Sequence, residues 1–178
     1  DIIEVIPDQP GFLLARANVQ LLMGLLDEAA MDAQAVLEVQ PSNIDAMNIL
    51  VSLSIRRDQP YQTVSRLDDL ISRAENLENK VRVAEKKSIY MASVHERNPE
   101  IFSLSEVLEV AKETWELDRS AVASGLFYAE KLVRAQFFER AKEVADFILE
   151  EYNPNNQRAR WAKFEAYMGS QQLDLAEK

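Results

Sequence analysis

The stretch FLLARANVQLLMGLLDEAAMDAQAVLEVQP, residues 12–41, decides the fold of this 178-residue chain. Its apolar residues recur at helical spacing, which predicts one helix over Phe12–Met23 and a second over Asp27–Val39. Gly24 suits the turn between antiparallel helices because glycine adopts positive φ at little cost. Pro41 ends the second helix. The stretch therefore predicts a packed helical hairpin.

A proline follows this hairpin at a regular period. Pro7 and Pro41 lie 34 residues apart, each after a short apolar and acidic run, and a similar run ends at Pro154. A period of this length is typical of stacked helical hairpins. Ala29 and Ala33 lie one helical turn apart, where small side chains let the paired helix approach closely. We therefore expect an array of helical repeats.

The rest of the chain predicts further hairpins of the same kind. Helices are expected over Ile44–Arg57, Tyr61–Ala74, Glu78–Glu96, Ser105–Leu117, Ala121–Arg134, Phe138–Tyr152 and Arg158–Met168. The connection RNPEIFSLSE, residues 97–106, is longer than the others and predicts an insertion of about nine residues. Residues 1–7 and 173–178 predict parts of further second helices, so we expect a segment of a longer array.

Composition limits the classes of function. The chain has 30 acidic and 20 basic residues and a net charge of −10, which disfavours nonspecific binding to nucleic acid. No apolar stretch approaches the roughly 18 residues that span a bilayer, so no direct membrane insertion is expected. The absence of cysteine excludes disulfides and thiolate metal sites. The residues do not indicate a compartment.

Several units resemble the tetratricopeptide repeat (TPR) family, whose unit has small residues in both helices, glycine at the turn and proline afterwards. The matching residues are Ala17, Gly24, Ala29, Ala33 and Pro41 in unit one, Leu50, Leu67 and Leu70 in unit two, Ala129, Phe138, Ala141, Ala145 and Pro154 in unit four, and Tyr167, Leu173 and Ala176 in unit five. The third unit barely matches. The resemblance implies an all-α, right-handed solenoid of about five stacked helix pairs.

The implied solenoid would occupy residues 1–178 as a single domain. Its parts would be the tail of a preceding repeat at 1–9, repeats at about 10–43, 44–77 and 121–156, an irregular repeat at 78–120 and a partial repeat at 157–178. In such arrays the first helices of the hairpins line a concave face.

The resemblance implies that this concave face binds a peptide. By the family's register it would present Leu14, Asn18, Leu21, Asn48, Ser52, Arg56, Arg82, Lys86, Tyr90, Leu126, Arg134, Arg158 and Trp161. Bases outnumber acids on the expected first helices, whereas the rest of the chain is strongly acidic. We therefore expect an acidic or C-terminal-carboxylate peptide, held by charge-assisted contacts from Arg56, Arg82 and Lys86. The alternative is that these bases pair with acids on neighbouring second helices.

Four of these residues are similar to the carboxylate clamp by which some TPR domains hold the C-terminus of heat-shock chaperones. They are Asn18, Asn48, Arg82 and Lys86. A clamp needs amides and cations that converge on two carboxylate oxygens. Leu14 stands where the family has its first clamp lysine, and the other positions are out of register. The alternative is a groove wall of exposed amides.

Other candidate sites favour structural interpretations. His95, the single histidine, lacks a cysteine or second histidine as a metal partner, so we expect it at a helix end or on the surface. The acidic pairs Asp68-Asp69 and Glu150-Glu151 are adjacent in sequence and would not face each other on a helix. No phosphate-binding glycine loop or hydrolase motif is present in the sequence. We therefore predict no catalytic residues, metal or cofactor.

Aromatic residues offer candidate ligand anchors. Trp115 falls on a second helix and is expected in the core, whereas Trp161 falls on the expected concave side. Of Phe137 and Phe138, one is expected to be buried and the other exposed. The basic clusters lack interleaved aromatic residues, which argues against nucleic-acid binding.

These observations predict a protein–protein interaction scaffold, not an enzyme. One alternative is a self-associating structural module, which light scattering would separate from a concentration-independent monomer. Another is the non-catalytic recruiting domain of a larger enzyme. The long connection from Asn98 to Ser105 either contacts a partner or accommodates a local change in the packing of the repeats.

Overall fold

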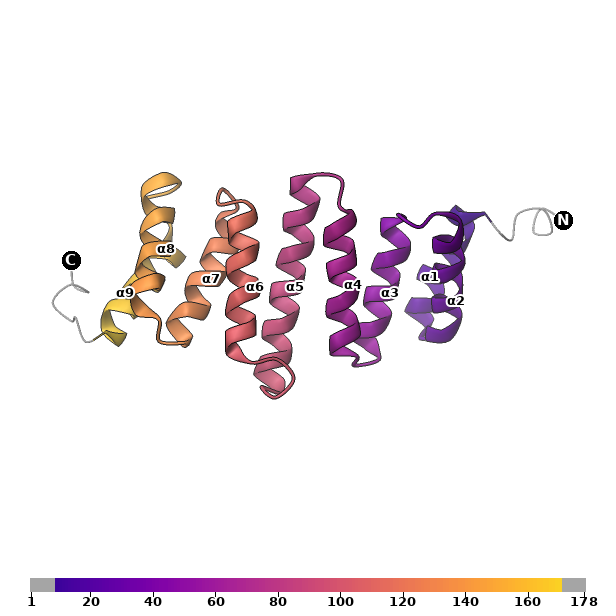
Figure 1. Cartoon of the computed structure of the whole chain (residues 1–178), viewed down its shortest axis with the longest axis horizontal. Helices are drawn as coiled ribbons and strands as arrows, with labels where there is room; N and C mark the ends of the chain where they lie inside the picture. The colour runs from indigo at the N-terminus through magenta and orange to yellow at the C-terminus, as the bar shows by residue number, and fades with distance from the viewer. Residues whose placement is uncertain (1–8, 171–178) are drawn as a thin grey trace. The chain divides into compact units, whose positions relative to one another are not determined.

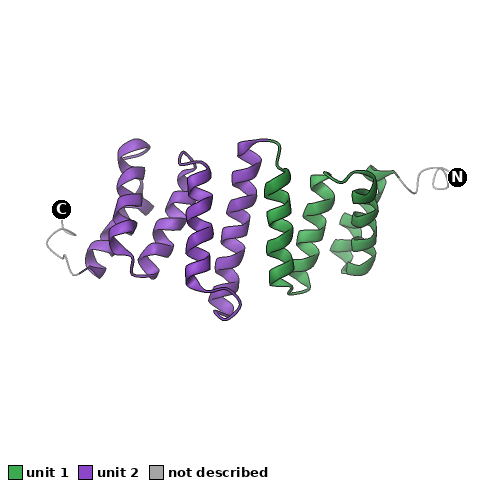
Figure 2. Ribbon diagram, viewed as in Figure 1, with its two compact units in different colours: residues 1–75 green, residues 76–178 purple. Residues whose placement is uncertain are grey.

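The structure, a computed structural model, describes residues 9–170 (Figure 1). Within that range the chain is all helical and contains no strand, which confirms the expected all-α class. The helices fall into two compact units, residues 1–75 and 76–178, which are coloured separately in Figure 2.

Unit 1 consists of two helical hairpins. Its helices are α1 (Pro10–Met23), α2 (Leu26–Val39), α3 (Ile44–Arg56) and α4 (Pro60–Arg73). Successive helices pack against each other, and α1 also contacts α3. Ala17, Ala29 and Ala33 are fully buried between α1, α2 and α3, so these small side chains set the close approach of the helices.

Unit 2 continues the pattern with five helices. They are α5 (Leu77–Arg97), α6 (Leu104–Leu117), α7 (Val122–Arg134), α8 (Phe138–Glu151) and α9 (Gln157–Gly169). Successive helices are again in contact, and α7 also contacts α9. The core surrounds Trp115, which is buried against the backbone of Gly125: a Cβ atom at Gly125 would lie 2.8 Å from the indole Nε1. The expectation that Trp115 belongs to the core is confirmed.

Short polar side chains and prolines fix where the helices begin. The side chains of Asn43, Asn76 and Asn156 each accept a hydrogen bond from the backbone N–H three residues later. Ser103 and Glu106 form a reciprocal capping box at the start of α6. Pro10 and Pro60 occupy first-turn positions, where the absent N–H costs nothing.

In each of three hairpins, one residue with a left-handed backbone conformation turns the chain between the two helices. It is Gly24 (φ 80°) between α1 and α2, Asp58 (φ 51°) between α3 and α4, and Gln136 (φ 62°) between α7 and α8. Gly24 and Asp58 are 34 residues apart, the same period as the prolines. The left-handed conformation costs little for glycine and more for Asp or Gln.

The hairpin of α5 and α6 turns in a different way. α5 has 21 residues, against 14 in α4, and it continues through Ala92, which lies 34 residues after Asp58 and is 4% exposed. The chain turns instead after Asn98. Phe102 is buried in this connection, and its carbonyl oxygen lies 2.8 Å from Nδ1 of His95 near the end of α5. His95 therefore lies at a helix end, as expected, and anchors the long connection.

The predicted helices agree with those found to within two residues at each end. The helical parts predicted at residues 1–7 and 173–178 lie outside the described residues. The division of the chain into five repeats stays a prediction.

Candidate functional site

Unit 2 contains a cavity of about 190 Å³ between α5, α7 and α9, with α6 behind it. We call it the α5–α7–α9 pocket. Its apolar lining comes from Ile89, Ala111, Ala123 and Phe127. Ile89 is 58% exposed, which places an apolar wall of the pocket within reach of solvent.

Two hydroxyl groups lie behind the apolar lining. Ser88 on α5 and Thr114 on α6 both line the pocket, and their hydroxyl oxygens are 2.7 Å apart. Thr114 also donates to the carbonyl of Val110 at 2.7 Å. Both side chains are buried and hydrogen-bonded, so this side of the pocket is fixed in the absence of a ligand.

A side-chain hydrogen bond joins two of the helices that line the pocket. The hydroxyl of Ser124 on α7 donates to Oε1 of Glu85 on α5 at 2.6 Å, and both residues line the pocket. Ser124 is buried and Glu85 is partly buried. A hydrogen bond to an ionised carboxylate is among the stronger neutral-to-charged contacts, so it holds α5 and α7 at a defined separation.

Ion pairs continue these links between first helices. Arg158 on α9 lines the pocket and donates to Glu130 Oε1 on α7 through Nε at 3.0 Å and Nη2 at 2.8 Å. Further along α7, Lys131 and Arg134 contact Glu96 Oε1 of α5 at 3.0 and 2.6 Å. Hydrogen bonding from Lys131, together with the charges of Lys131 and Arg134, lowers the pKa of Glu96.

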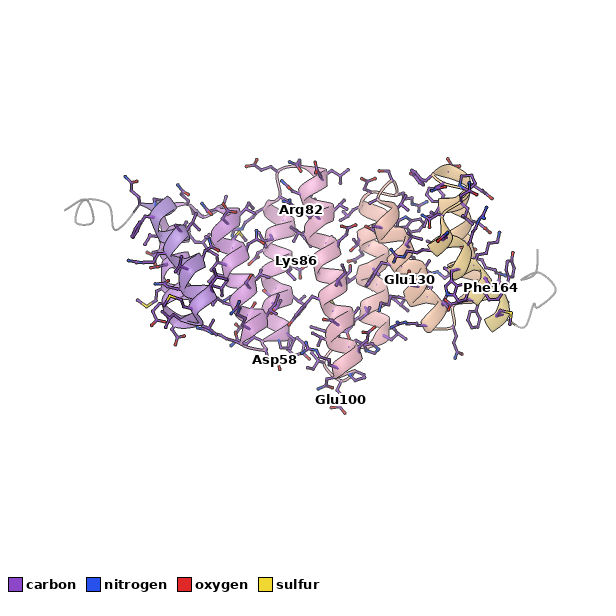
Figure 3. All side chains as sticks on the ribbon, turned by 180° about the vertical axis from the view of Figure 1, so that it is seen from behind. Asp58, Arg82, Lys86, Glu100, Glu130 and Phe164 are labelled. Atoms are coloured by element: carbon purple, nitrogen blue, oxygen red, sulfur yellow. The ribbon has the colours of Figure 1, made fainter. Side chains whose placement is uncertain are left out.

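The outer face of α5 adds two cations next to the pocket. Arg82, Lys86 and Ile89 follow one another at spacings of four and three residues, so they lie on successive turns of one helix face, and all three are exposed. Figure 3 labels Arg82 and Lys86 on α5 together with Glu130 on α7. The Arg82 guanidinium donates to the neutral amide oxygen of Asn79 at 2.8 Å.

The Lys86 ammonium lies in a partly desolvated position. Although the side chain reaches solvent, burial by the surrounding protein lowers its pKa. Asp146 has the opposite effect on Lys163 of α9, whose pKa is raised because the carboxylate accepts a hydrogen bond from the ammonium at 2.5 Å. Among residues 9–170, no carboxylate lies within ion-pair distance of Lys86.

Two residues that the family's register placed on the concave face are buried instead. Tyr90 is 9% exposed and Leu126 is 5% exposed. Their neighbours Ile89 and Phe127 line the pocket. At these two positions the prediction is wrong by one residue, toward the N-terminus on α5 and toward the C-terminus on α7, whereas Arg82, Lys86 and Arg134 are exposed as predicted. Val81, Ala84 and Met91, all buried, follow helical spacing along α5, and this spacing is the sequence signal for a core face that does not depend on the family's register.

The basic site residues of α7 and α9 are paired. Arg134 and Arg158 contact glutamates, as the alternative interpretation of the bases proposed, but these glutamates lie on first helices and not on second helices. Trp161 is 60% exposed and stacks on Phe164, with ring centroids 5.4 Å apart. It therefore remains accessible on α9.

The site residues predicted in unit 1 bond mainly to their own helices. The Asn18 amide donates to the carbonyl of Leu14 at 2.9 Å, and the Ser52 hydroxyl donates to the carbonyl of Asn48 at 3.0 Å. Arg56 is exposed at the end of α3. Leu14 and Leu21 are half-buried and pack against the unit 1 core. The predicted clamp takes its amides from unit 1 and its cations from unit 2, and it stays a prediction.

Two other expectations from the sequence concern adjacent pairs of side chains. Phe137 is 52% exposed and Phe138 is half-buried, as expected for one outward and one inward aromatic residue. The acidic pairs Asp68-Asp69 and Glu150-Glu151 are exposed on α4 and α8. In the part of the chain that the structure describes, no helix combines the length and apolar character needed to cross a membrane.

Comparison with known proteins identifies the fold. No family model and no curated protein matches the sequence. YrrB, a TPR protein with an unusual peptide-binding site, has a crystal structure that is 13% identical in sequence with a TM-score of 0.62, over 98% of this chain and 84% of YrrB. The MamA protein is 14% identical with a TM-score of 0.56, over 94% of this chain and 86% of MamA. The chain therefore has the helical-repeat fold of TPR proteins.

Proposed function

We propose that this protein is an interaction scaffold that binds a peptide segment of a partner protein on its first helices, with the α5–α7–α9 pocket as the anchor point. The observation that carries the proposal is the pocket itself, which is open, mostly apolar and fixed on several sides by hydrogen bonds. Because the pocket walls are already ordered, binding an apolar side chain there does not incur the entropic cost of ordering them. YrrB, which shares the fold, is itself a TPR protein with a peptide-binding site.

The proposal assigns binding, and not catalysis, to the charged residues of the pocket. Glu85 accepts a hydrogen bond from Ser124, and Arg158 is held by Glu130. Both charged groups thereby position the helices around the apolar lining. A peptide side chain in the pocket would contact Ile89 and Phe127, and the adjoining peptide would extend over the exposed stripe of α5.

Filling the pocket tests this proposal. Ala123 is exposed and lines the pocket, so Ala123→Trp should occupy it. Peptides selected from a phage-displayed library of random 12-residue sequences on the wild-type chain would be synthesised, labelled and titrated by fluorescence anisotropy. We expect Ala123→Trp to weaken binding about tenfold or more, the effect of losing a central anchor.

The matched control is Gln34→Trp, which adds the same side chain at an exposed position on α2 in unit 1. It should leave the affinity unchanged, and circular dichroism should show both variants folded. Equal affinities of wild type and Ala123→Trp would move the binding site away from the pocket. A library selection without enrichment would contradict peptide binding itself.

A further inference from the structure

The stripe on α5 combines an apolar wall with two cations. Ile89 forms part of the pocket wall, Lys86 lies one helical turn before it and Arg82 two turns before it. A turn rises 5.4 Å, so the cations are displaced from Ile89 by about 5 and 11 Å along the helix. A ligand anchored in the pocket and running along α5 therefore passes both charges.

The charges of this stripe are not neutralised by the protein. Arg82 donates to an uncharged amide oxygen, and Lys86 has no carboxylate within ion-pair distance among the described residues. Desolvation by the surrounding protein lowers the pKa of Lys86, and no carboxylate among the described residues offsets this effect. By contrast, Lys131, Arg134 and Arg158 already pair with glutamates. Lys86 and Arg82 thus place positive charge without a carboxylate partner beside one end of the pocket.

We infer that the peptide bound here carries an aliphatic or aromatic side chain for the pocket and an Asp or Glu side chain two to four residues away, which contacts Lys86 and Arg82. The inference rests on the proposed function. The spacing follows because an extended peptide rises about 3.3 Å per residue, which matches the 5 to 11 Å between the pocket wall and the cations. An acid at that place restores to Lys86 the electrostatic stabilisation that desolvation removes.

A side-chain carboxylate fits this arrangement better than a C-terminal carboxylate. A terminal carboxylate is held by several donors that converge on its two oxygens. Here the two cations lie on successive turns of one helix, and the Arg82 guanidinium shares one of its N–H groups with Asn79. Separate cations along a helix suit acidic side chains of a peptide that continues past them.

A charge reversal tests the inference. The random 12-residue library would be displayed as N-terminal fusions to a coat protein, so that no displayed peptide has a free C-terminus and only side chains supply carboxylates. Selection on the wild-type chain should enrich an apolar residue with Asp or Glu two to four residues away. Selection on Lys86→Glu should enrich Lys or Arg at that place. For a synthetic wild-type ligand, Glu→Gln or Asp→Asn should weaken binding about tenfold.

The controls separate failure of the inference from failure of the proposed function. Lys112→Glu reverses a charge on α6 outside the α5–α7–α9 pocket and should not change the selected sequences. Lys86 is exposed, and a circular dichroism melt would verify that Lys86→Glu is folded; Arg82→Glu provides a second charge reversal on the same face.

Two outcomes would overturn the inference and leave the pocket as the binding site. In the first, the enriched peptides bind Ala123→Trp more weakly than wild type but show no preference for an acid. In the second, the preference for an acid persists in both Lys86→Glu and Arg82→Glu. Binding only by synthetic peptides with a free C-terminus would also overturn it, in favour of a terminal carboxylate. Enriched peptides that bind Ala123→Trp as well as wild type would overturn both proposals, as would a selection without enrichment.

Discussion

Polar side chains join the two helices of a hairpin in both units, and in unit 2 they also join successive first helices. In unit 1, Arg16 of α1 forms two 2.6 Å hydrogen bonds with Asp32 of α2, and Thr63 of α4 donates to Ser54 of α3 at 2.9 Å. These bonds join the first and second helices of one hairpin. In unit 2, Ser124 bonds across from α7 to α5, and Arg158 bonds across from α9 to α7. These bonds join the first helix of one hairpin to the first helix of the next.

The difference shows how one fold can place a pocket in one unit. Bonds within a hairpin fix the hairpin but leave the spacing between successive first helices to apolar packing. Bonds between first helices set that spacing directly, and in unit 2 two of them involve residues that line the pocket. We therefore attribute the fixed shape of the pocket to these links.

Removal of core volume should give the largest effect and would test whether the units are independent. Ile148 of α8 is 0% exposed and Leu53 of α3 is 1% exposed. Ile148→Ala and Leu53→Ala should each lower the free energy of unfolding by about 2–5 kcal/mol, through lost burial and a residual cavity. Amide hydrogen exchange should show reduced protection only in the unit that carries the substitution.

The two substitutions serve as controls for each other. Equal loss of protection in both units from either variant would show that the chain unfolds as one cooperative body. The contrast between the units would then concern only their side-chain bonds and not their stabilities.

Neutralising Glu96 should have an intermediate effect on the links of unit 2. Lys131 is only 9% exposed, and its ammonium loses its anionic partner in Glu96→Gln. We expect a loss of about 1 kcal/mol, at the upper end for a pair whose acid is exposed. Chemical denaturation at neutral pH would measure it. The matched control Lys112→Gln removes a solvent-accessible i,i+4 pair within α6 and should cost less.

The effect of Glu96 should depend on pH with a defined sign. Its pKa is lowered in the folded state because Lys131 and Arg134 stabilise the charged form. The contribution is therefore fully present above the unfolded value of about 4.3 and is lost as the pH falls through the lower folded pKa. The stability difference between wild type and Glu96→Gln should shrink below about pH 4.3, and a constant difference down to pH 2 would contradict this assignment.

The sequence predicted the helices well because their signals are local. Gly24, Pro41 and the apolar spacing around them need no information from distant residues. The pocket could not be predicted in the same way. The bond from Ser124 to Glu85 joins residues 39 apart, and the choice between Ile89 and Tyr90 for the exposed face depends on how the neighbouring helices pack against α5. The small buried Ser88 also obscures the apolar pattern of α5.

The third hairpin shows the same limit of a fixed register. Projecting the 34-residue period onto α5 places a turn at Ala92, but α5 runs through that position and ends at Arg97. The 34-residue period therefore misplaces the turn of this hairpin. The composition of the connection after Asn98 signalled the irregularity, although it did not show which residues would face the pocket.

The smallest predicted effects concern the turns of the regular hairpins. Gln136 and Asp58 adopt left-handed backbone at the place where the first hairpin has Gly24. Gln136→Gly should stabilise the chain by up to about 1 kcal/mol, because glycine removes the left-handed strain at a cost in unfolded-state entropy. Asp58→Gly should gain less, since Asp tolerates this conformation better than Gln. Thermal unfolding of both variants beside Gly24→Ala, which should destabilise, would measure the order. If Gln136→Gly destabilises the chain, the Gln136 side chain contributes more to the α7–α8 hairpin than its backbone conformation costs, and the three turns are not equivalent.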